Sequence, residues 1–525
     1  MTQELFPARR SLVLSSLFAT LITFISFGLG IWVLADPGIR AGFVFYRVAH
    51  TIDQEYAGSV NWQSAIQSST SSIFGQLDRY SEYLEPRDFD DLGEEMSGGY
   101  QGIGVSVIES DSGLLIMSVR EGGPAAQAGM LTGDIIIRID TVSLAHLAVN
   151  KASDLLRGPE GTSVHLTIAR PATGDTLSVE PTRRRIDFQH VSFAGYTPDS
   201  MIYIRLLDFD AGASEDLEVA LDSLLNKPGY EAKGVILDLK GNPGGLFSEA
   251  YNTSSLFLPA GKFIVGTSSR SRWNQEKHSS DAEDITNGLP MAILVDRGSA
   301  SAAEIVSGSL KQLGRAVLIG DTTFGKGLVQ GYSQFPDGSG GKLTISRYYL
   351  EGNLYLNRFD SNMFDTGKGL VPTYQFAYPE DKPFLAALEG SLLPMHFAQL
   401  HQDDLLAGPP PLGPDTGWVE QFAVYCSIHK FDYKSPQTES AEMLLATAKL
   451  EKSSQETITS AEELVKLAKA SDYTAFFENQ NYILMRLRQI AAERKFGEYR
   501  AYTEIVVPQR RDIRFAEEIL KEAKD

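Results

Sequence analysis

Three short segments of the sequence carry groups that could together perform acyl transfer. Residues 298–304 read GSASAAE between an expected strand and an expected helix, so a serine there is exposed beside the positive end of a helix dipole. Residues 322–330 read TTFGKGLVQ, and the apolar neighbours of Lys326 predict a lowered pKa and some neutral amine to take the serine proton. Residues 238–245 read DLKGNPGG, a tight turn whose N–H groups suit a developing oxyanion.

Each segment also has a plain structural explanation when it is taken alone. NPGG is an ordinary turn, a serine before a helix is an ordinary N-cap, and a lysine in a loop usually lies on the surface. None of the eight histidines forms an H-E-x-x-H zinc pattern or lies in these segments. Spacing alone leaves a Ser–His–Asp triad open, but nothing supports it, and a serine–lysine pair is a recognised variant.

The elements around these segments predict a largely parallel sheet. From Met201 onward, expected strands alternate with expected helices, which indicates βαβ crossovers. The strands are expected at 201–206, 234–239, 291–296 and 315–320, and the helices at 211–225 and 302–313.

The flanking regions have different patterns. Residues 98–185 contain short β-like runs divided by glycine, with one helical stretch near 147–157, which predicts a small β-rich module. Residues 37–96 have helical periodicity. After the proline-rich segment 407–417, which we interpret as a linker or rigid loop, the chain becomes helical again and ends in a charged helix after Pro508.

Composition limits the possible classes of protein. The 525 residues predict roughly three or four domains, and 43% hydrophobic with 22% charged residues is typical of a globular chain. The net charge of −20 argues against a nucleic-acid partner, because phosphate binding needs a basic face. The single cysteine, Cys426, allows neither an intramolecular disulfide nor a cysteine-based zinc site.

Residues 11–35 form a stretch of 25 residues without a charge. Such a length spans a bilayer core with some tilt, and Arg9 and Arg10 before it place the N-terminus in the cytoplasm. A cleaved signal peptide is the main alternative, but its apolar region is shorter, about 7–15 residues. A buried core helix is a further alternative. We therefore expect a single-pass signal anchor in the inner membrane, with the rest of the chain in the periplasm.

The motifs and their order resemble those of the C-terminal processing peptidases, or tail-specific proteases, which are PDZ-containing serine–lysine endopeptidases. The resemblance runs from about residue 40 to 375. It includes LDRYSEYL at 77–84, YQGIGV at 100–105, GPAAQAGMLTGDIIIRID at 123–140, DLKGNPGG, VDRGSASAAEIVSGSL and GDTTFGKGLVQ. The chain departs from the family pattern at Lys240 (often Arg), Ala303 (often Ser), Arg79-Tyr80 (often Pro-His) and GLVPT at 369–373.

The resemblance implies roles for the residues of the three segments. Ser301 corresponds to the nucleophile, because the family's serine stands three residues before the motif's glutamate, here Glu304. Lys326 corresponds to the general base and Gln330 to the residue that orients it. The backbone N–H of Ala302 and one from the Gly244–Gly245 turn correspond to the oxyanion hole. No metal or organic cofactor is implied.

The β-rich module corresponds to the PDZ domain, which binds a peptide as an added strand and captures its terminal carboxylate with backbone N–H groups. The expected peptide-binding residues are Gly102, Ile103, Gly104, Val105, Leu155 and Leu156. The expected substrates are therefore extracytoplasmic proteins or peptides with a free C-terminal carboxylate. A PDZ-like fold that only packs against the core is the alternative.

The resemblance implies an α/β (α+β multidomain) fold class with a crotonase/Clp-protease-like peptidase core. The expected parts are the cytoplasmic tip and anchor (1–36), a helical region packing on the core (37–96), the inserted PDZ domain (97–185), the peptidase core (186–375) and a helical C-terminal extension (376–525). The extension could cover the sheet, form a homo-oligomer contact or bind an adaptor; a packing extension without an activity of its own is the plain alternative.

Two other functions are weighed against the serine endopeptidase. One is a membrane-anchored PDZ scaffold with an inactive peptidase core, which would be expected to lack the serine, lysine or glutamine of the site. The other is a crotonase-like enzyme acting on acyl thioesters, which the lysine-bearing motif and the PDZ insertion count against.

Overall fold

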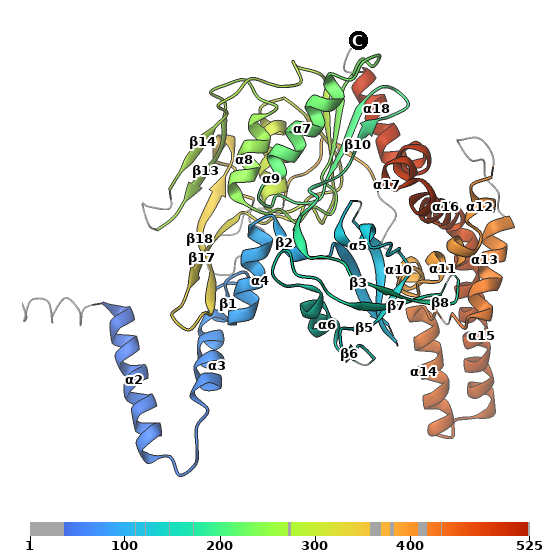
Figure 1. The fold of residues 1–525 in the computed structure, drawn as a ribbon, viewed down its shortest axis with the longest axis horizontal. Coiled ribbons are helices and arrows are strands. Elements are labelled where there is room, and N and C mark those ends of the chain that lie inside the picture. Colours follow the sequence, from blue (N-terminus) through green and yellow to red (C-terminus); the bar gives the residue numbers. More distant parts are fainter. Residues whose placement is uncertain are drawn as a thin grey trace, which may run out of the picture. The chain divides into compact units, whose positions relative to one another are not determined.

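The computed structural model describes residues 36–110, 112–120, 122–145, 147–171, 173–270, 275–356, 369–377, 383–407, 417–431 and 433–522 (Figure 1). The expected anchor at 11–35 lies outside these residues, as does most of the proline-rich segment. Within the described ranges, no helix combines the length and the apolar character that crossing a membrane requires. The chain falls into two compact units, one up to Leu77 and one from Asp78, which are described separately.

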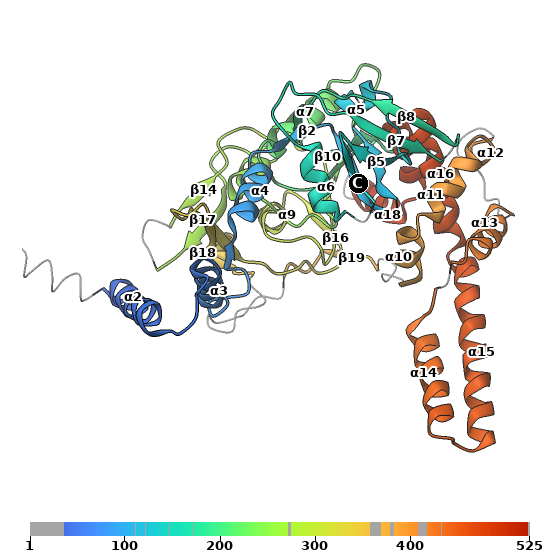
Figure 2. The same cartoon turned by 60° about the horizontal axis from the view of Figure 1, so that its bottom comes forward.

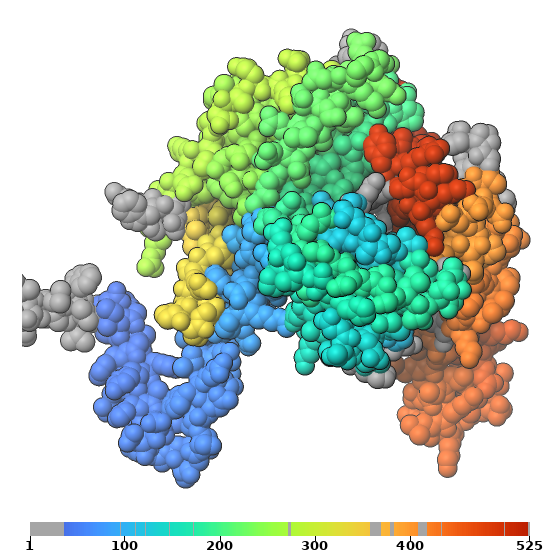
Figure 3. Space-filling model, in the orientation of Figure 1, coloured from blue at the N-terminus to red at the C-terminus, as the bar shows by residue number. Residues whose placement is uncertain are grey.

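The first unit contains two helices, α2 (Pro37–Glu55) and α3 (Trp62–Phe74). Each begins at a capping side chain: Asp36 accepts a hydrogen bond from Ile39 N at 3.0 Å, and Asn61 accepts one from Ser64 N at 3.2 Å. Neither helix buries a side chain, and their surface is drawn in dark blue in Figure 3.

The expected single region 37–96 is divided in the structure. Residues from Asp78 onward belong to the second unit, where strand β1 (Glu82–Leu84) pairs with β18 (Gly340–Tyr349) and is followed by helix α4 (Pro86–Met96). Residues 78–96 therefore belong to the second unit, because β1 is hydrogen-bonded to a strand of that unit.

The β-rich module is an antiparallel sheet with two helices. Its strands follow the order β3-β4-β5-β7-β8, with β6 beside β5. The elements are β3 (Val105–Ser110), β4 (Gly113–Val119), α5 (Pro124–Gln127), β5 (Ile135–Ile139), β6 (Val142–Ser143), α6 (Val149–Leu156), β7 (Leu166–Arg170) and β8 (Asp175–Val179). The chain enters through β2 (Gly99–Gly102) and leaves through β9 (Arg184–Asp187), and these two strands pair. Both ends of the module therefore meet, as an inserted domain requires.

The central sheet follows the order β10-β11-β12-β15-β16-β19. All neighbours from β11 to β19 are parallel, as the sequence predicted, and only β10 is antiparallel. The strands are β10 (Val191–Tyr196), β11 (Ile202–Leu206), β12 (Val235–Asp238), β15 (Met291–Val295), β16 (Val317–Gly320) and β19 (Tyr374–Gln375). Strands β12 and β15 are buried along their whole length, which explains their unbroken apolar sequences.

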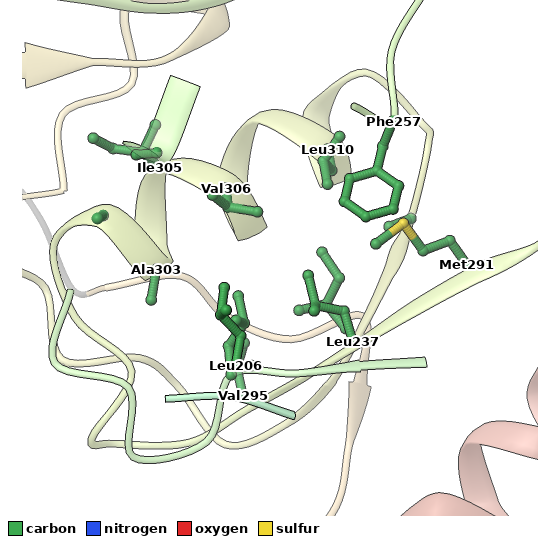
Figure 4. Close-up of a cluster of buried hydrophobic side chains, with 14 of the residues drawn as sticks. Leu206, Leu237, Phe257, Met291, Val295, Ala303, Ile305, Val306 and Leu310 are labelled. Atoms are coloured by element: carbon green, nitrogen blue, oxygen red, sulfur yellow. The ribbon is translucent and has the colours of Figure 1, made fainter. Parts of the chain in front are cut away.

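One face of the central sheet packs against α7 (Ala213–Leu225), α8 (Phe247–Ser255) and α9 (Ala302–Gln312). Figure 4 shows part of this core, in which Val306 and Leu310 of α9 lie near Leu237, Met291 and Phe257. The helix that begins directly after Ser301 is thus anchored by burial.

The other face of the central sheet is covered by the C-terminal end of the chain. This segment comprises α17 (Glu498–Ala501), the π-helical turn η3 (Tyr502–Val506), η4 (Val507–Gln509) and α18 (Arg511–Glu522). Ile513, Ala516 and Leu520 pack in one cluster with Ile236 and Leu294 of the sheet. This segment thus covers the sheet, which is one of the roles expected for the C-terminal extension: both sheet faces are apolar, and the segment buries the second.

A second sheet joins β1, β18, β13 and β14, with β17 also paired to β18. Its remaining strands are β13 (Phe263–Ser268), β14 (Lys277–Ser279) and β17 (Leu328–Gln334), and the short helix η2 (Glu351–Asn353) follows β18. Strand β17 begins two residues after Lys326 and carries Gln330.

In the sequence, a cluster of helices follows β19 and precedes the C-terminal segment. They are α10 (Pro383–Gly390), α11 (Leu393–Leu400), α12 (Gln402–Leu405), α13 (Gly417–Ile428), α14 (Pro436–Leu450), α15 (Gln455–Glu478) and α16 (Gln480–Phe496). Phe397, Phe422 and Leu487 lie in their common core, and α14 and α15 form an antiparallel hairpin (Figure 2). The Arg494 guanidinium donates to Thr132 O of the β-rich module at 3.1 Å.

Candidate active site

A cavity of about 370 Å³ lies at the carboxyl ends of the parallel strands, where open α/β sheets generally bind ligands. It is lined by all six residues for which the family resemblance implies a role in catalysis or in the oxyanion hole: Ser301, Lys326, Gln330, Ala302, Gly244 and Gly245. The other walls come from α4, the loop after β11, the turn after β12, α8, α9, β17 and β18. They are formed by Leu92, Met96, Asp208, Asp210, Pro243, Leu246, Phe247, Ile305, Leu328, Val329, Tyr332, Lys342 and Tyr348.

Ser301 stands between the loop after β15 and the first turn of α9. Its backbone has φ 53° and ψ −113°, a sparsely populated conformation for a residue with a side chain. Such a conformation costs about 1–3 kcal/mol and persists only where the surroundings enforce it. Here Ala300 N donates to Asn242 O at 3.0 Å, and Phe324 N donates to Ser299 O at 3.0 Å. The strain is therefore held by both neighbouring loops.

The turn at Gly244 presses directly against this serine. A Cβ on Gly244 would lie 2.8 Å from Ala300 O and 2.8 Å from Ser301 Cβ, and the residue has φ 99°. Glycine is required there both for the close approach and for the positive φ.

The two glycines of the turn differ in what their N–H groups do. Gly244 N donates to Asn242 Oδ1 at 2.9 Å, so it is not available to an oxyanion. Gly245 N and Ala302 N have no hydrogen-bond partner among the described residues. The expectation of one donor from the Gly244–Gly245 turn is thus narrowed to Gly245 N, because the Asn242 side chain already accepts the hydrogen bond of Gly244 N.

Lys326 lies in a partly buried position beside an aromatic ring. Its Nζ is 5.2 Å from the ring centroid of Tyr80, and in the described part of the chain it makes no hydrogen bond or ion pair. Burial and the nearby Lys342 ammonium lower the pKa of Lys326, and the Glu304 carboxylate acts in the opposite direction. This is the direction that a lysine base needs.

Gln330 lines the same cavity but does not bond to Lys326. No hydrogen bond joins the two side chains in the described structure, and the Gln330 Nε2 is buried without a partner. The orienting role that the family resemblance implies for Gln330 therefore stays a prediction.

Glu304 is the residue that the sequence reasoning used only to identify Ser301. It is 0% exposed and accepts from Ser301 N (3.0 Å), Lys326 N (2.8 Å), Gly325 N (2.7 Å) and Thr323 Oγ1 (2.5 Å). One carboxylate thus joins the serine loop to the lysine loop. Burial raises its pKa, although the four hydrogen bonds oppose this. The spacing S-x-x-E of a capping box was the available signal.

The expected peptide-binding residues lie together in the β-rich module and do not line the cavity. Gly104 has φ 76°, which suits a carboxylate-binding turn, and Val105 begins β3. Ile103 and Leu156 are buried in the module's core, and Leu155 packs on the same cluster. Leu156 is therefore a core residue, and peptide binding at this turn remains a prediction.

Helix α4 connects the module to the cavity, a link that the sequence did not indicate. Its Leu92 and Met96 line the cavity, and its acidic Asp91 and Glu94 each lie 3.0 Å from the Arg157 guanidinium at the end of α6. These pairs are largely exposed, so each contributes at most about 1 kcal/mol.

No group of three or more His, Cys, Asp or Glu side chains is placed to hold a metal ion in the residues that the structure covers. Cys426 is buried among the C-terminal helices, where burial raises the pKa of its thiol to about 12.

Comparisons with known proteins agree with the geometry. The model of peptidase family S41 matches residues 200–358, and a PDZ domain model matches residues 115–170. A carboxy-terminal-processing protease of Bartonella bacilliformis is 32% identical over 311 residues, which are 59% of this chain and 70% of that protein. The carboxy-terminal processing protease CtpA of Bacillus subtilis is 33% identical over 331 residues, or 63% of this chain and 67% of that protein.

Among solved structures, a photosystem II D1 C-terminal processing protease is 25% identical, with 64% of this chain and 88% of that chain covered and a TM-score of 0.36. The sequence relatives share the peptidase and most of their length with this chain. The chain therefore belongs to the carboxy-terminal processing proteases of peptidase family S41, with a PDZ domain inserted before its peptidase core.

Proposed function

We propose that the chain is a serine–lysine endopeptidase in which Ser301 is the nucleophile and Lys326 the general base. One observation carries the proposal: both side chains line one cavity, where Ser301 is held in a strained conformation and the pKa of Lys326 is lowered by burial. A serine hydroxyl is a weak nucleophile unless a neighbouring base accepts its proton.

In the proposed reaction, the neutral Lys326 amine takes the Ser301 proton as Oγ attacks the substrate carbonyl carbon. The carbonyl π electrons move to oxygen, and the N–H groups of Gly245 and Ala302 stabilise this oxyanion. Collapse breaks the C–N bond, and Lys326 returns its proton to the departing amine. Water, deprotonated by Lys326, then attacks the acyl-enzyme, and the carboxylic acid product leaves as Ser301 regains its proton.

The proposed substrates are extracytoplasmic proteins with a free C-terminal carboxylate, recognised at the Gly102–Val105 turn of the PDZ domain. Support comes from the turn's glycines and from the uncharged stretch 11–35, which would anchor the chain in the inner membrane with the catalytic part in the periplasm.

The catalytic pair is tested with Ser301→Ala and Lys326→Ala in the full chain. Each should lower the cleavage rate of a reporter protein with an unstructured C-terminal tail by about 10³-fold or more. Matched controls are Ser333→Ala in β17 and Lys277→Ala in β14, which do not line the cavity and should leave the rate within twofold. Mass spectrometry after fluorophosphonate treatment should place the adduct on Ser301. Full activity of either cavity variant would exclude the mechanism.

Recognition of the carboxylate is tested by comparing the same reporter with a free and an amidated C-terminus. The proposal predicts that amidation raises KM about tenfold or more, because the PDZ turn loses its charged partner. Equal KM values for both substrates would remove the terminal carboxylate from the recognition model.

A further inference from the structure

We infer that Arg510 and Asp512, at the start of the last helix, are positioning residues for the turn that supplies the Gly245 oxyanion donor, acting through Asp238 and Lys240. This inference rests on the proposed function, since it takes the cavity at Ser301 to be catalytic. It assigns a role in the reaction to a segment more than 200 residues after the nucleophile, beyond the part of the chain that matches the peptidase family model.

Asp238 ends strand β12 and is 0% exposed. Its Oδ2 accepts from Arg510 Nη2 at 2.8 Å and from Tyr203 OH at 2.8 Å, while its Oδ1 accepts from Lys240 N at 3.0 Å. Burial alone would raise the pKa of Asp238, but Arg510 and Lys240 outweigh it and lower this pKa. The carboxylate therefore stays charged and fixes the direction in which the chain leaves the strand.

Asp512 makes the second connection between the helix and the turn. Its carboxylate receives two hydrogen bonds from Arg510, at 2.7 and 2.6 Å, and one from Lys240 Nζ at 2.5 Å. The Asp512 side chain is 4% exposed, so these contacts are shielded from solvent. Lys240 is thus held at its backbone by Asp238 and at its ammonium group by Asp512.

From Lys240 the turn continues into the active site through further fixed groups. Gly241 N donates to Asp296 Oδ1 at 2.9 Å, and Asn242 Nδ2 donates to Leu206 O at 3.0 Å. Asn242 Oδ1 accepts a hydrogen bond from Gly244 N, so Gly245 N is the donor of this turn that has no partner in the described structure. A shift of Lys240 would pass along this short, hydrogen-bonded path to Gly245. A displacement of about 1 Å in such a group can lower a rate about 100-fold.

The charged side chains of Asp238, Lys240, Arg510 and Asp512 form an ionic cluster beside the turn. Its position, rather than any contribution to stability, is the argument for a positioning role. Buried ion pairs often give little net stability compared with well-packed apolar residues. Farther along the helix, Ile513, Ala516 and Leu520 lie in the core shared with the sheet, and the buried Glu517 accepts from Asp199 N at 3.3 Å. The buried charges that pair with one another, Asp238, Arg510 and Asp512, lie at the end of the helix nearest the turn.

The same helix offers a matched control at its other end. Lys521 pairs with Asp199 at 2.6 Å, and this pair also joins α18 to the segment before β11. It is largely exposed, with side-chain exposures of 50% and 43%, and neither residue lines the cavity. Lys240→Gln and Lys521→Gln therefore each remove one lysine–aspartate contact of the same helix, but only the first touches the turn.

The test uses the full chain with four variants: Lys240→Gln, Lys521→Gln, the charge-conserving Lys240→Arg, and Ser301→Ala. We expect Lys240→Gln to lower kcat about tenfold or more with KM within twofold, and to raise hydrogen exchange in the peptide covering residues 239–246. Binding of a peptide aldehyde, whose tetrahedral adduct uses the oxyanion donors, should weaken by a similar factor. Lys521→Gln should change none of these, and Lys240→Arg should restore most of kcat.

The outcomes separate the inference from the proposed function. If Ser301→Ala stays active, the proposed function fails, and hydrogen exchange at 239–246 alone decides whether the helix positions the turn. Unchanged exchange and kcat in Lys240→Gln would overturn the inference. An equal loss in Lys240→Gln and Lys521→Gln would also overturn it, because the effect would then reflect helix docking in general.

Discussion

Two fully buried carboxylates, Glu304 and Asp238, support the two halves of the candidate active site, and they are held in opposite ways. Glu304 lies under the serine and lysine loops and accepts hydrogen bonds only from neutral groups, three backbone N–H groups and the Thr323 hydroxyl. Asp238 precedes the Gly244–Gly245 turn and is held by the Arg510 guanidinium, with Lys240 nearby. Burial raises the pKa of Glu304, whereas the cations lower the pKa of Asp238.

The difference shows how the chain can place negative charge near a lysine base without pairing with it. A carboxylate satisfied by neutral dipoles leaves Lys326 without an ion pair, so burial can still lower the lysine pKa. A carboxylate satisfied by cations stays ionised and rigid but needs those cations to be supplied. Here one of them, Arg510, comes from the far end of the chain.

The largest expected effect concerns the cations beside Asp238. Arg510→Met removes the guanidinium and leaves a buried carboxylate without its main partner, so it should lower the free energy of unfolding by about 3–5 kcal/mol. Arg500→Met is the matched control, because its pair with Glu504 lies in the same C-terminal segment but is half exposed. It should lose about 1 kcal/mol or less. Equal losses in urea denaturation would contradict the contrast between buried and exposed pairs.

The next effect concerns Glu304, where activity should suffer more than stability. Glu304→Gln places an amide NH₂ against donors that faced an oxygen, so we expect a stability loss of about 1–3 kcal/mol. The two loops should shift and kcat should fall about 10–100-fold. Loss of the carboxylate charge should also lower the pKa of Lys326 further and move the rising limb of the pH–rate profile to lower pH.

The control for this variant is Glu249→Gln. Glu249 accepts from Ser214 N at 2.9 Å and Ser214 Oγ at 2.6 Å but does not line the cavity. It should lose stability with kcat and the pH profile unchanged. If Glu304→Gln keeps the wild-type pH profile, its carboxylate does not act on Lys326 in the way described.

The residues around Glu304 could be predicted from the sequence much better than those around Asp238. Short motifs and the family resemblance together pointed to Ser301 and Lys326, and Glu304 stands within the serine motif. The hydrogen-bond partners of Glu304 lie only 3–22 residues away in the sequence. The parallel strands were also predictable, since burial on both faces leaves unbroken apolar runs. Which glycine of the turn keeps a free N–H was not predictable, because it depends on the rotamer of Asn242.

The surroundings of Asp238 depend on contacts between residues that are far apart in the sequence, so no local pattern reveals them. Arg510 lies 272 residues from Asp238, and its helix reads as an ordinary charged C-terminal helix. Nothing in its sequence shows that its apolar side chains cover one face of the central sheet. Pairings across such distances are set by the tertiary fold, so the sequence left the role of residues 376–525 open among several alternatives.

Glu304 and Asp512, the second carboxylate that pairs with Arg510 beside Asp238, should also give opposite pH dependence to stability. Glu304 has a raised pKa in the folded chain, so its contribution is full below the unfolded value near 4.5 and is lost as pH rises through the folded pKa. Asp512 has a lowered pKa, so its contribution is full above the unfolded value near 3.8 and is lost only as pH falls below it.

This difference is measured as the gap in unfolding free energy between wild type and each variant from pH 4.5 to 8. The gap to Glu304→Gln should shrink with rising pH, while the gap to Asp512→Asn should stay flat across the same range. Parallel slopes for the two variants would mean that both carboxylates are held alike.

The smallest expected effects come from two buried tyrosines, one on each side of the comparison. Tyr203 OH donates to Asp238 Oδ2 at 2.8 Å, whereas Tyr348 OH reaches only Ser301 O at 3.4 Å. Because a bond to a charged acceptor is the stronger, Tyr203→Phe should lose about 1–2 kcal/mol and Tyr348→Phe about 0.5 kcal/mol. The decrease in kcat should instead be larger for Tyr348→Phe than for Tyr203→Phe, since Tyr348 lines the cavity and Tyr203 does not. A larger stability loss for Tyr348→Phe would mean that the serine loop, rather than the ionic cluster, is the more tightly held side.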